Sequence, residues 1–142
     1  MDQIPKAITY VAPVLQVSDL PRSIAYYRDR LGFGLEFEYE GFYASVLRDG
    51  CRVHLSCATP PARDQNAFEA AERLDACFGV VDARALASEL AAAGASISVN
   101  LRAMPYGQEV YVRDPDGYIL GFVQPNEPEA GAVPQVAGDR RR

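Results

Sequence analysis

The sequence lacks several features that would point directly to one function. His54 is the only histidine among the 142 residues, so a pair or triad of histidines cannot form. Tryptophan is absent as well. There is no glycine-rich phosphate loop and no GxSxG nucleophile motif, so the sequence offers no evidence for a nucleotide-binding loop or a serine hydrolase of that type.

Membrane and export segments are also missing from the sequence. No apolar run approaches the roughly 20 residues that a membrane helix needs. The N-terminus, Met-Asp-Gln-Ile-Pro, has neither the basic start nor the apolar stretch of a secretory signal. We therefore expect a cytoplasmic protein with no membrane partner.

The three cysteines, Cys51, Cys57 and Cys77, are odd in number, and no two of them form a CxxC pair. They lie in apolar, strand-like runs, which favours reduced side chains in the core of a cytosolic protein. A disulfide or a cysteine-based metal cluster is the less favoured interpretation.

Composition and charge are those of a globular, acidic domain. Apolar residues make up 49% and charged residues 23% of the chain, which is typical of a folded domain rather than a disordered one. The net charge is −5, which argues against nucleic acid or an anionic membrane as the main partner. An acidic surface suits a cationic ligand, although many acidic domains are simply soluble.

Residues 1–60 contain one strand–helix–strand–strand–strand pattern. A strand is expected over residues 12–17, and a helix over residues 21–31, with Asp19 as the N-cap and Gly32 after the last turn. Residues 35–39 alternate apolar and acidic side chains, which indicates a strand with one wet face. Strands over residues 42–47 and 52–57 flank an Asp-Gly pair, which predicts a hairpin.

Residues 75–125 repeat this pattern after a polar, proline-containing connector over residues 61–74. Asp82 caps a second expected helix that ends at Gly94, and it follows Asp19 at an offset of 63 residues. Further strands are expected over residues 75–81, 97–101, 109–113 and 118–124, with an Asp-Pro-Asp-Gly turn between the last two. Such a repeat indicates a duplicated unit. The tail, residues 126–142, has the composition of a disordered segment.

Three motifs give the sequence a resemblance to a known family. They are Val14-Leu15-Gln16-Val17-Ser18-Asp19-Leu20, Tyr26-Tyr27-Arg28-Asp29-Arg30-Leu31-Gly32-Phe33 and Val112-Arg113-Asp114-Pro115-Asp116-Gly117-Tyr118. Together they resemble the vicinal-oxygen-chelate superfamily of glyoxalases, bleomycin-resistance proteins and dioxygenases. The resemblance implies an α+β fold of two βαβββ modules whose sheets curl into a shared cup, usually in a dimer.

Enzymes of this superfamily hold a divalent metal with four side chains, from the first and last strands of each module. The corresponding positions here are Ala12, His54, Asp75 and Gly121. Ala12 and Gly121 have no donor side chain, so the resemblance implies a lost metal site, and we expect no cofactor. A weak site made by His54, Asp75 and water remains conceivable. Small residues at these positions should leave the cup roomy.

Within the superfamily the closest similarity is to the bleomycin-resistance proteins. The segments Ala12-Pro13-Val14-Leu15 and Arg52-Val53-His54-Leu55 resemble theirs. That resemblance implies a metal-free homodimer that captures a cationic antibiotic such as bleomycin in clefts between its subunits. Carboxylates would pair with the cation, and aromatic rings would stack on flat heterocycles. The absence of tryptophan departs from the pattern of such binders.

Alternation along the strands selects the candidate ligand-binding residues. If Val53 and Leu55 face the helix layer, Arg52 and His54 face the cup. The candidates are His54, Asp75, Tyr43, Tyr106, Glu109, Tyr111, Tyr118 and Arg52, and no residue is assigned a catalytic or metal-binding role.

Each of these candidates also has a plain structural interpretation. His54 could be a hydrogen-bonded strand histidine, and Asp75 an ordinary acid at the start of a strand. Glu109 and Tyr111 share one strand face, which could lie at the edge of a sheet. The tyrosines could pack as ordinary strand aromatics, and Tyr106 is a candidate because an aromatic-glycine pair precedes that strand in the family.

Three functions stay open at this point. The first is a metal-independent binding protein of bleomycin-resistance type, which captures a cationic or hydrophobic antibiotic-like ligand. The second is a divergent glyoxalase-like lyase or isomerase with a relocated or two-ligand metal site. The third is an interaction module whose cup is filled by its own side chains. Ligand identity and any exchange of the N-terminal strand between protomers are not determined by the sequence.

Overall fold

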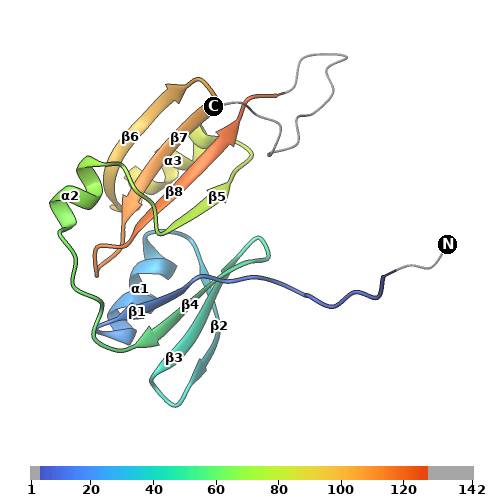
Figure 1. The fold of residues 1–142 in the computed structure, drawn as a ribbon, viewed down its shortest axis with the longest axis vertical. Coiled ribbons are helices and arrows are strands. Elements are labelled where there is room, and N and C mark those ends of the chain that lie inside the picture. Colours follow the sequence, from blue (N-terminus) through green and yellow to red (C-terminus); the bar gives the residue numbers. More distant parts are fainter. Residues whose placement is uncertain (1–3, 128–142) are drawn as a thin grey trace.

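A computed structural model describes residues 4–127 of the chain. These residues form two four-stranded mixed sheets, each with a helix packed on one face (Figure 1). The predicted α+β fold class is therefore confirmed. The expected tail lies almost wholly outside the described residues.

The first sheet has the strand order β1-β4-β3-β2. Its elements are β1 (Val14–Val17), α1 (Leu20–Asp29), β2 (Gly34–Tyr39), β3 (Tyr43–Arg48) and β4 (Cys51–Cys57). Strand β1 pairs in parallel with β4, and the other pairs are antiparallel. Asp19 caps α1 by accepting a hydrogen bond from the backbone N–H of Arg22, as its position in the sequence predicts.

The second sheet repeats this order as β5-β8-β7-β6. Its elements are β5 (Ala76–Gly79), α3 (Ala83–Ala92), β6 (Ser96–Met104), β7 (Gly107–Arg113) and β8 (Ile119–Pro125). Asp82 caps α3 in the same way, with the backbone N–H of Ala85 as donor. The two helix starts are equivalent because each is stabilised by a carboxylate three residues from its donor.

The connector between the sheets contains a helix that the sequence analysis did not predict. This helix, α2 (Gln65–Ala70), is capped by Asp64 and lies beside the second sheet (Figure 1). None of its residues is buried. The helix has no apolar stripe that could have predicted it. It is held in place by polar contacts with residues far along the chain: Arg113 donates to Glu69, and Gln65 donates to the carbonyl of Gly117.

One apolar core joins the two halves. Tyr27 of α1 is fully buried and donates a hydrogen bond of 2.9 Å to the carboxylate of Asp114, in the turn between β7 and β8. Tyr26, next to it, donates to the backbone carbonyl of Arg113 and accepts from the N–H of Ser96. These contacts fix the first helix against the end of the second sheet.

Strand β2 departs from the predicted alternation. All six of its residues are exposed, and the strand lies at the edge of the sheet. The pairing with β3 shifts between Leu35 and Phe37. A bulge inserts one extra residue into a strand. Here it lets both Glu36 and Phe37 contact residues of β3 and β4: Glu36 contacts Ser45 and Arg52, and Phe37 contacts Tyr43 and His54.

The cysteine prediction was wrong in one respect. Cys51, Cys57 and Cys77 are free thiols, but all three are exposed rather than buried. Cys51 and Cys57 are the first and last residues of β4, beyond the cover of the core, and Cys77 lies on the face of β5 that alternation turns away from the core.

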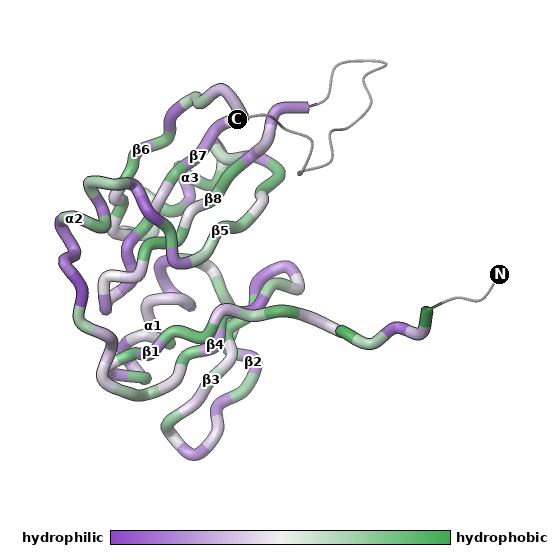
Figure 2. The backbone as a smooth tube through the Cα atoms, viewed as in Figure 1, coloured by the Kyte–Doolittle hydropathy of each residue, from purple (hydrophilic) through white to green (hydrophobic). Residues whose placement is uncertain are grey.

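The N-terminal segment before β1 extends away from the body of the protein (Figure 1). It carries exposed apolar residues, among them Ile4, Ile8 and Val11 (Figure 2). None of the helices in residues 4–127 has the length and apolar composition needed to cross a membrane.

Candidate functional site

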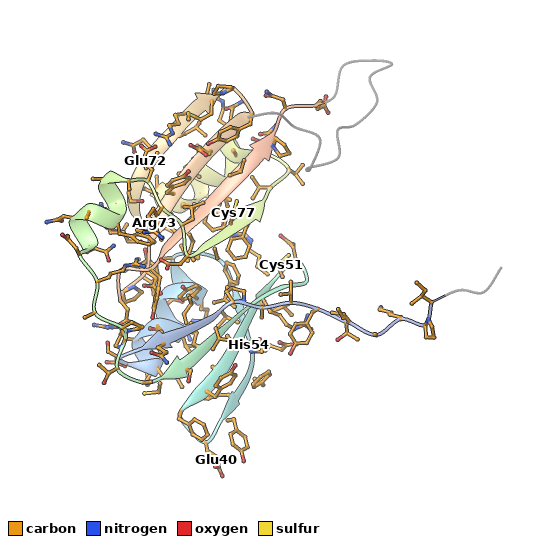
Figure 3. The ribbon with its side chains drawn as sticks, in the orientation of Figure 1. Glu40, Cys51, His54, Glu72, Arg73 and Cys77 are labelled. Atoms are coloured by element: carbon orange, nitrogen blue, oxygen red, sulfur yellow. The ribbon has the colours of Figure 1, made fainter. Side chains whose placement is uncertain are left out.

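An aromatic cluster occupies the face of the first sheet that is turned away from α1. We define it as Tyr10, Phe37, Tyr43 and His54. Val53 and Leu55 of β4 are fully buried on the helix side, so His54 between them points to the opposite face, as alternation predicts. Figure 3 shows His54 on this sheet.

The rings of the aromatic cluster meet around His54. The ring centroid of His54 lies 5.4 Å from that of Tyr43, 5.9 Å from that of Phe37 and 5.9 Å from that of Tyr10. Phe37 and Tyr43 are stacked, with centroids 6.5 Å apart. These separations are those of favourable aromatic pairs. The cluster is therefore a preformed apolar platform, and Phe37 keeps 41% of its surface exposed.

The imidazole of His54 has one nitrogen engaged and one free. Its Nδ1 lies 2.9 Å from the hydroxyl oxygen of Tyr43. Its Nε2 is buried and has no hydrogen-bond partner among the described residues. A buried polar atom without a partner costs stability. A ligand that displaced the neighbouring side chains and hydrogen-bonded to Nε2 would recover part of that cost.

A charged pair borders the aromatic cluster. The guanidinium of Arg52 donates to both carboxylate oxygens of Glu36, at 2.9–3.1 Å, and lies 4.4 Å from the ring centroid of Tyr10. Ser45, which is buried, donates to the same carboxylate at 2.7 Å. These donors hold the pKa of Glu36 below its usual value.

A second cluster lies on the second sheet, centred on Glu109 of β7. We define the Glu109 cluster as Arg102, Tyr106, Glu109 and Tyr111. Only 1% of Glu109 is exposed, and its carboxylate accepts from Tyr106 at 2.5 Å, from Arg102 at 2.8 Å and from Tyr111 at 3.2 Å. Arg102 also donates two hydrogen bonds to Glu72, at the end of the connector.

The charges of the Glu109 cluster hold one another in place. Burial, together with the adjacent Glu109 carboxylate, raises the pKa of both Tyr106 and Tyr111. The carboxylates of Glu72 and Glu109 raise the pKa of Arg102. The carboxylate of Glu109 is therefore already paired with Arg102, and a cationic ligand would have to replace Arg102 to reach it.

Asp75 and Tyr118, the remaining predicted residues, lie outside both clusters. The carboxylate of Asp75 accepts two hydrogen bonds from Arg63, at 2.8 and 3.0 Å, and one from the backbone N–H of Ile119. Tyr118 donates to the backbone carbonyl of Gln16, and so links the second sheet to the first. Both have clear structural roles.

Among the described residues, no hydrogen bond, ion pair or aromatic contact connects the aromatic cluster with the Glu109 cluster. The structure brings Tyr43, His54 and Arg52 together on one sheet and Tyr106, Glu109 and Tyr111 together on the other. Figure 3 shows this separation through His54 on the first sheet and Glu72 beside the second.

The four positions at which the family holds a metal do not fit a metal here. Ala12 and Gly121 carry no donor, and Asp75 is held by Arg63. The expected space at Gly121 is also filled, because the side chain of Leu74 would lie 2.8–3.0 Å from a Cβ atom added there. Within residues 4–127, no three His, Cys, Asp or Glu side chains gather closely enough to hold one ion.

Several residues of these clusters were missed by the sequence analysis. Tyr10 lies before the first strand, and Phe37 reads as part of an ordinary apolar strand face. Arg102 and Glu72 are charged residues in unremarkable surroundings along the chain. Arg102 could have been suggested only by its pairing with Glu109 across neighbouring strands, and the sequence does not fix that register.

A model of the "Glyoxalase/Bleomycin resistance protein/Dioxygenase superfamily" matches residues 7–122 of the chain. The chain belongs to this superfamily. A search of curated proteins gave no match.

Solved structures of the superfamily show the same fold. A bleomycin-binding protein from bleomycin-producing Streptomyces verticillus, complexed with copper(II)-bleomycin, is 26% identical, with a TM-score of 0.64 over 86% of this chain and 100% of that chain. TnmS3, an antibiotic binding protein from Streptomyces sp. CB03234, is 22% identical, with a TM-score of 0.64 over 86% and 100%. A lactoylglutathione lyase from Agrobacterium tumefaciens is 18% identical, with a TM-score of 0.59 over 85% and 95%.

Proposed function

We propose that this member of the superfamily binds a small antibiotic-like molecule without a metal, and that the aromatic cluster is the main part of its site. The observation that carries the proposal is the set of rings around His54, whose Nε2 is buried and lacks a partner. Ring platforms of this kind stack on flat heterocycles, and the unpaired nitrogen of His54 offers one directional hydrogen bond to a ligand that displaces the side chains covering it.

The acidic character of the chain supports a cationic ligand. The net charge is −5, and Glu36 beside the aromatic cluster and Glu109 in the Glu109 cluster each already hold an arginine. A ligand cation would lie over the exposed ring of Phe37 or compete with Arg52 for Glu36. The similar bleomycin-binding protein from Streptomyces verticillus gives bleomycin as the first compound to test.

A homodimer would complete the site. In one chain no other described element covers the exposed rings of Phe37 and Tyr10 in the aromatic cluster, and the Glu109 cluster lies on a separate sheet. A second copy that placed its Glu109 cluster over the aromatic cluster would close a cleft lined by rings on one side and by tyrosines and a carboxylate on the other. The exposed β2 edge would be covered in the same step.

The proposal is tested by titrating the protein with metal-free bleomycin and with copper(II)-bleomycin in a calorimeter. We expect saturable binding and recovery of the compound unchanged after long incubation. Phe37→Ala should weaken binding by about tenfold, since an aromatic contact is worth roughly 0.5–1.5 kcal/mol beyond its buried area. Phe42→Ala is the matched control, because Phe42 is similarly exposed, at 48%, but contacts Tyr39 rather than His54.

Each outcome decides one part of the proposal. If neither form of bleomycin binds, bleomycin is excluded as the ligand. If Phe37→Ala and Phe42→Ala weaken binding equally, the aromatic cluster is not the site. If protein purified without chelator contains a stoichiometric divalent metal, the metal-independent proposal is wrong and the glyoxalase-like alternative is favoured.

A further inference from the structure

A cavity lies at the seam between the two halves, away from both clusters. Its volume is about 440 Å³, within the range of about 300–1,000 Å³ that is typical of small-molecule sites. Three phenylalanine rings form its floor. The rings of Phe33 and Phe78 meet edge to face with centroids 5.9 Å apart, and those of Phe78 and Phe122 are stacked at 5.2 Å.

The walls of this seam cavity come from both halves. Ala85 and Leu86 in the first part of α3 form one wall, and Cys51 at the start of β4 lies on the opposite half. Figure 3 shows Cys51 where the first sheet approaches β5. A molecule in the cavity would therefore touch both halves of the chain at once.

The rim of the seam cavity is acidic. Its charged residues are one arginine and three acids, a net charge of −2: Arg48, Asp49, Asp82 and Glu89. The guanidinium of Arg48 is fully engaged, since it donates to Glu89 at 2.7 and 2.9 Å and to the carbonyl of Leu31 at 2.8 Å. The uncompensated charge of the rim is therefore negative.

We propose that the seam cavity binds a second small molecule, an aromatic or hydrophobic amine that carries a positive charge. Phenylalanine rings attract a cation through their π faces, and the apolar floor buries the hydrocarbon part of such an amine. The acidic rim disfavours carboxylates and phosphates by charge repulsion. None of the lining residues belongs to the aromatic cluster or to the Glu109 cluster, so this site is independent of the proposed function.

The charge selectivity is tested with two probes that share one ring system. The fluorescence anisotropy of 1-naphthylmethylammonium and of 1-naphthylacetate is followed as the protein is added. We expect the ammonium compound to bind at least about threefold more tightly, as partly exposed charge interactions predict. Asp49→Asn removes one exposed rim charge and should reduce this preference. Equal binding of the two probes would overturn the charge assignment.

The location is tested by filling the cavity. Ala85→Trp places an indole in the cavity from its α3 wall, so it should weaken binding of 1-naphthylmethylammonium by about tenfold or more. Ala91→Trp is the matched control, because Ala91 is an exposed residue of the same helix that does not line the cavity. An unchanged affinity in Ala85→Trp would overturn the proposal.

A chemical readout comes from the thiols. Cys51 lines the cavity whereas Cys57, also exposed, does not. Saturating 1-naphthylmethylammonium should slow the reaction of Cys51 with a neutral maleimide and leave that of Cys57 unchanged, as peptide mass spectrometry would show. Equal protection of both thiols would contradict the assignment.

Two further outcomes separate this proposal from others. If Ala85→Trp dissociates an oligomer in light scattering and no probe binds, the cavity is a contact between copies and not a ligand site. Bleomycin binding that is unchanged in Ala85→Trp would show that the two sites are distinct. Absence of bleomycin binding would leave the naphthyl titration as a valid test of the seam cavity.

Discussion

Asp114 offers a quantitative test of how the two halves are held together. Its carboxylate is 5% exposed and accepts hydrogen bonds from the hydroxyl of Tyr27 and from the backbone N–H groups of Asp116 and Tyr118, at 2.9–3.0 Å. Burial, only partly offset by these donors, raises its pKa from 3.8 to about 6. The group should therefore make stability depend on pH in a window where few other side chains titrate.

The sign of this effect follows from the direction of the shift. The folded chain binds the proton of Asp114 more tightly than the unfolded chain does. Its contribution to stability is present in full below the unfolded pKa of 3.8 and is lost as the pH rises through about 6. The difference between the folded and unfolded pKa values corresponds to about 3 kcal/mol of unfolding free energy in total, at about 1.36 kcal/mol per pKa unit.

Asp114→Asn removes the titration and keeps the shape of the side chain. The amide oxygen can still accept from the two backbone N–H groups, and the hydroxyl of Tyr27 can turn to accept from the amide. We expect the unfolding free energy of the wild-type chain, relative to Asp114→Asn, to fall by about 2.4 kcal/mol between pH 4 and pH 7, since part of the full contribution is already lost at pH 4.

Urea denaturation followed by circular dichroism at several pH values would measure this difference. Taking the difference cancels the carboxylates whose pKa is lowered by arginine, such as Glu36, Glu69 and Glu89, which act in the opposite direction. Asp49→Asn is the control, since the side chain of Asp49 is 92% exposed. A difference between wild type and Asp114→Asn that stays constant from pH 4 to pH 7 would refute the reasoning.

Three further predictions concern the clusters and their strands. Arg102→Leu leaves the buried carboxylate of Glu109 without its cation and should cost about 3 kcal/mol, whereas adding Glu109→Gln should restore most of that loss in urea denaturation. Gly107→Ala should lower the melting temperature by several degrees, because a Cβ atom there would collide with the neighbouring strand β8; an unchanged melting temperature would contradict this. Tyr43→Phe removes the hydrogen bond to Nδ1 of His54 and should cost about 1 kcal/mol by chemical denaturation, and no loss would show that the bond contributes nothing.

Features set by neighbours along the chain could be predicted from the sequence. Asp19 and Asp82 begin the two helices, since a cap needs only a carboxylate and an N–H three residues later. The turn at Asp49 and Gly50 joins β3 to β4 because both residues adopt positive φ. The repeat of these signals at a fixed offset indicated a duplicated unit, and the family resemblance implied the fold class. The alternation along β4 placed His54 on the face away from the helix.

Features set by distant parts of the chain could not be predicted. The bulge in β2 brings Glu36 and Phe37 beside His54, and it depends on the pairing with β3. The connector forms α2 because Glu69 binds Arg113, and because Arg63 binds Asp75. A sequence shows these residue types but not the register that pairs them.

The duplicated unit, its helix caps and the loss of two metal-ligand positions were determined by the sequence itself, because each depends on the identity of a residue or on hydrogen bonds within one turn. The tertiary structure decided the rest. It divided the candidate ligand residues between two sheets, it paired Glu109 with Arg102, and it placed Leu74 in the space beside Gly121. Those outcomes depend on which side chains meet after the sheets have formed, and side chains far apart in the sequence meet only through packing.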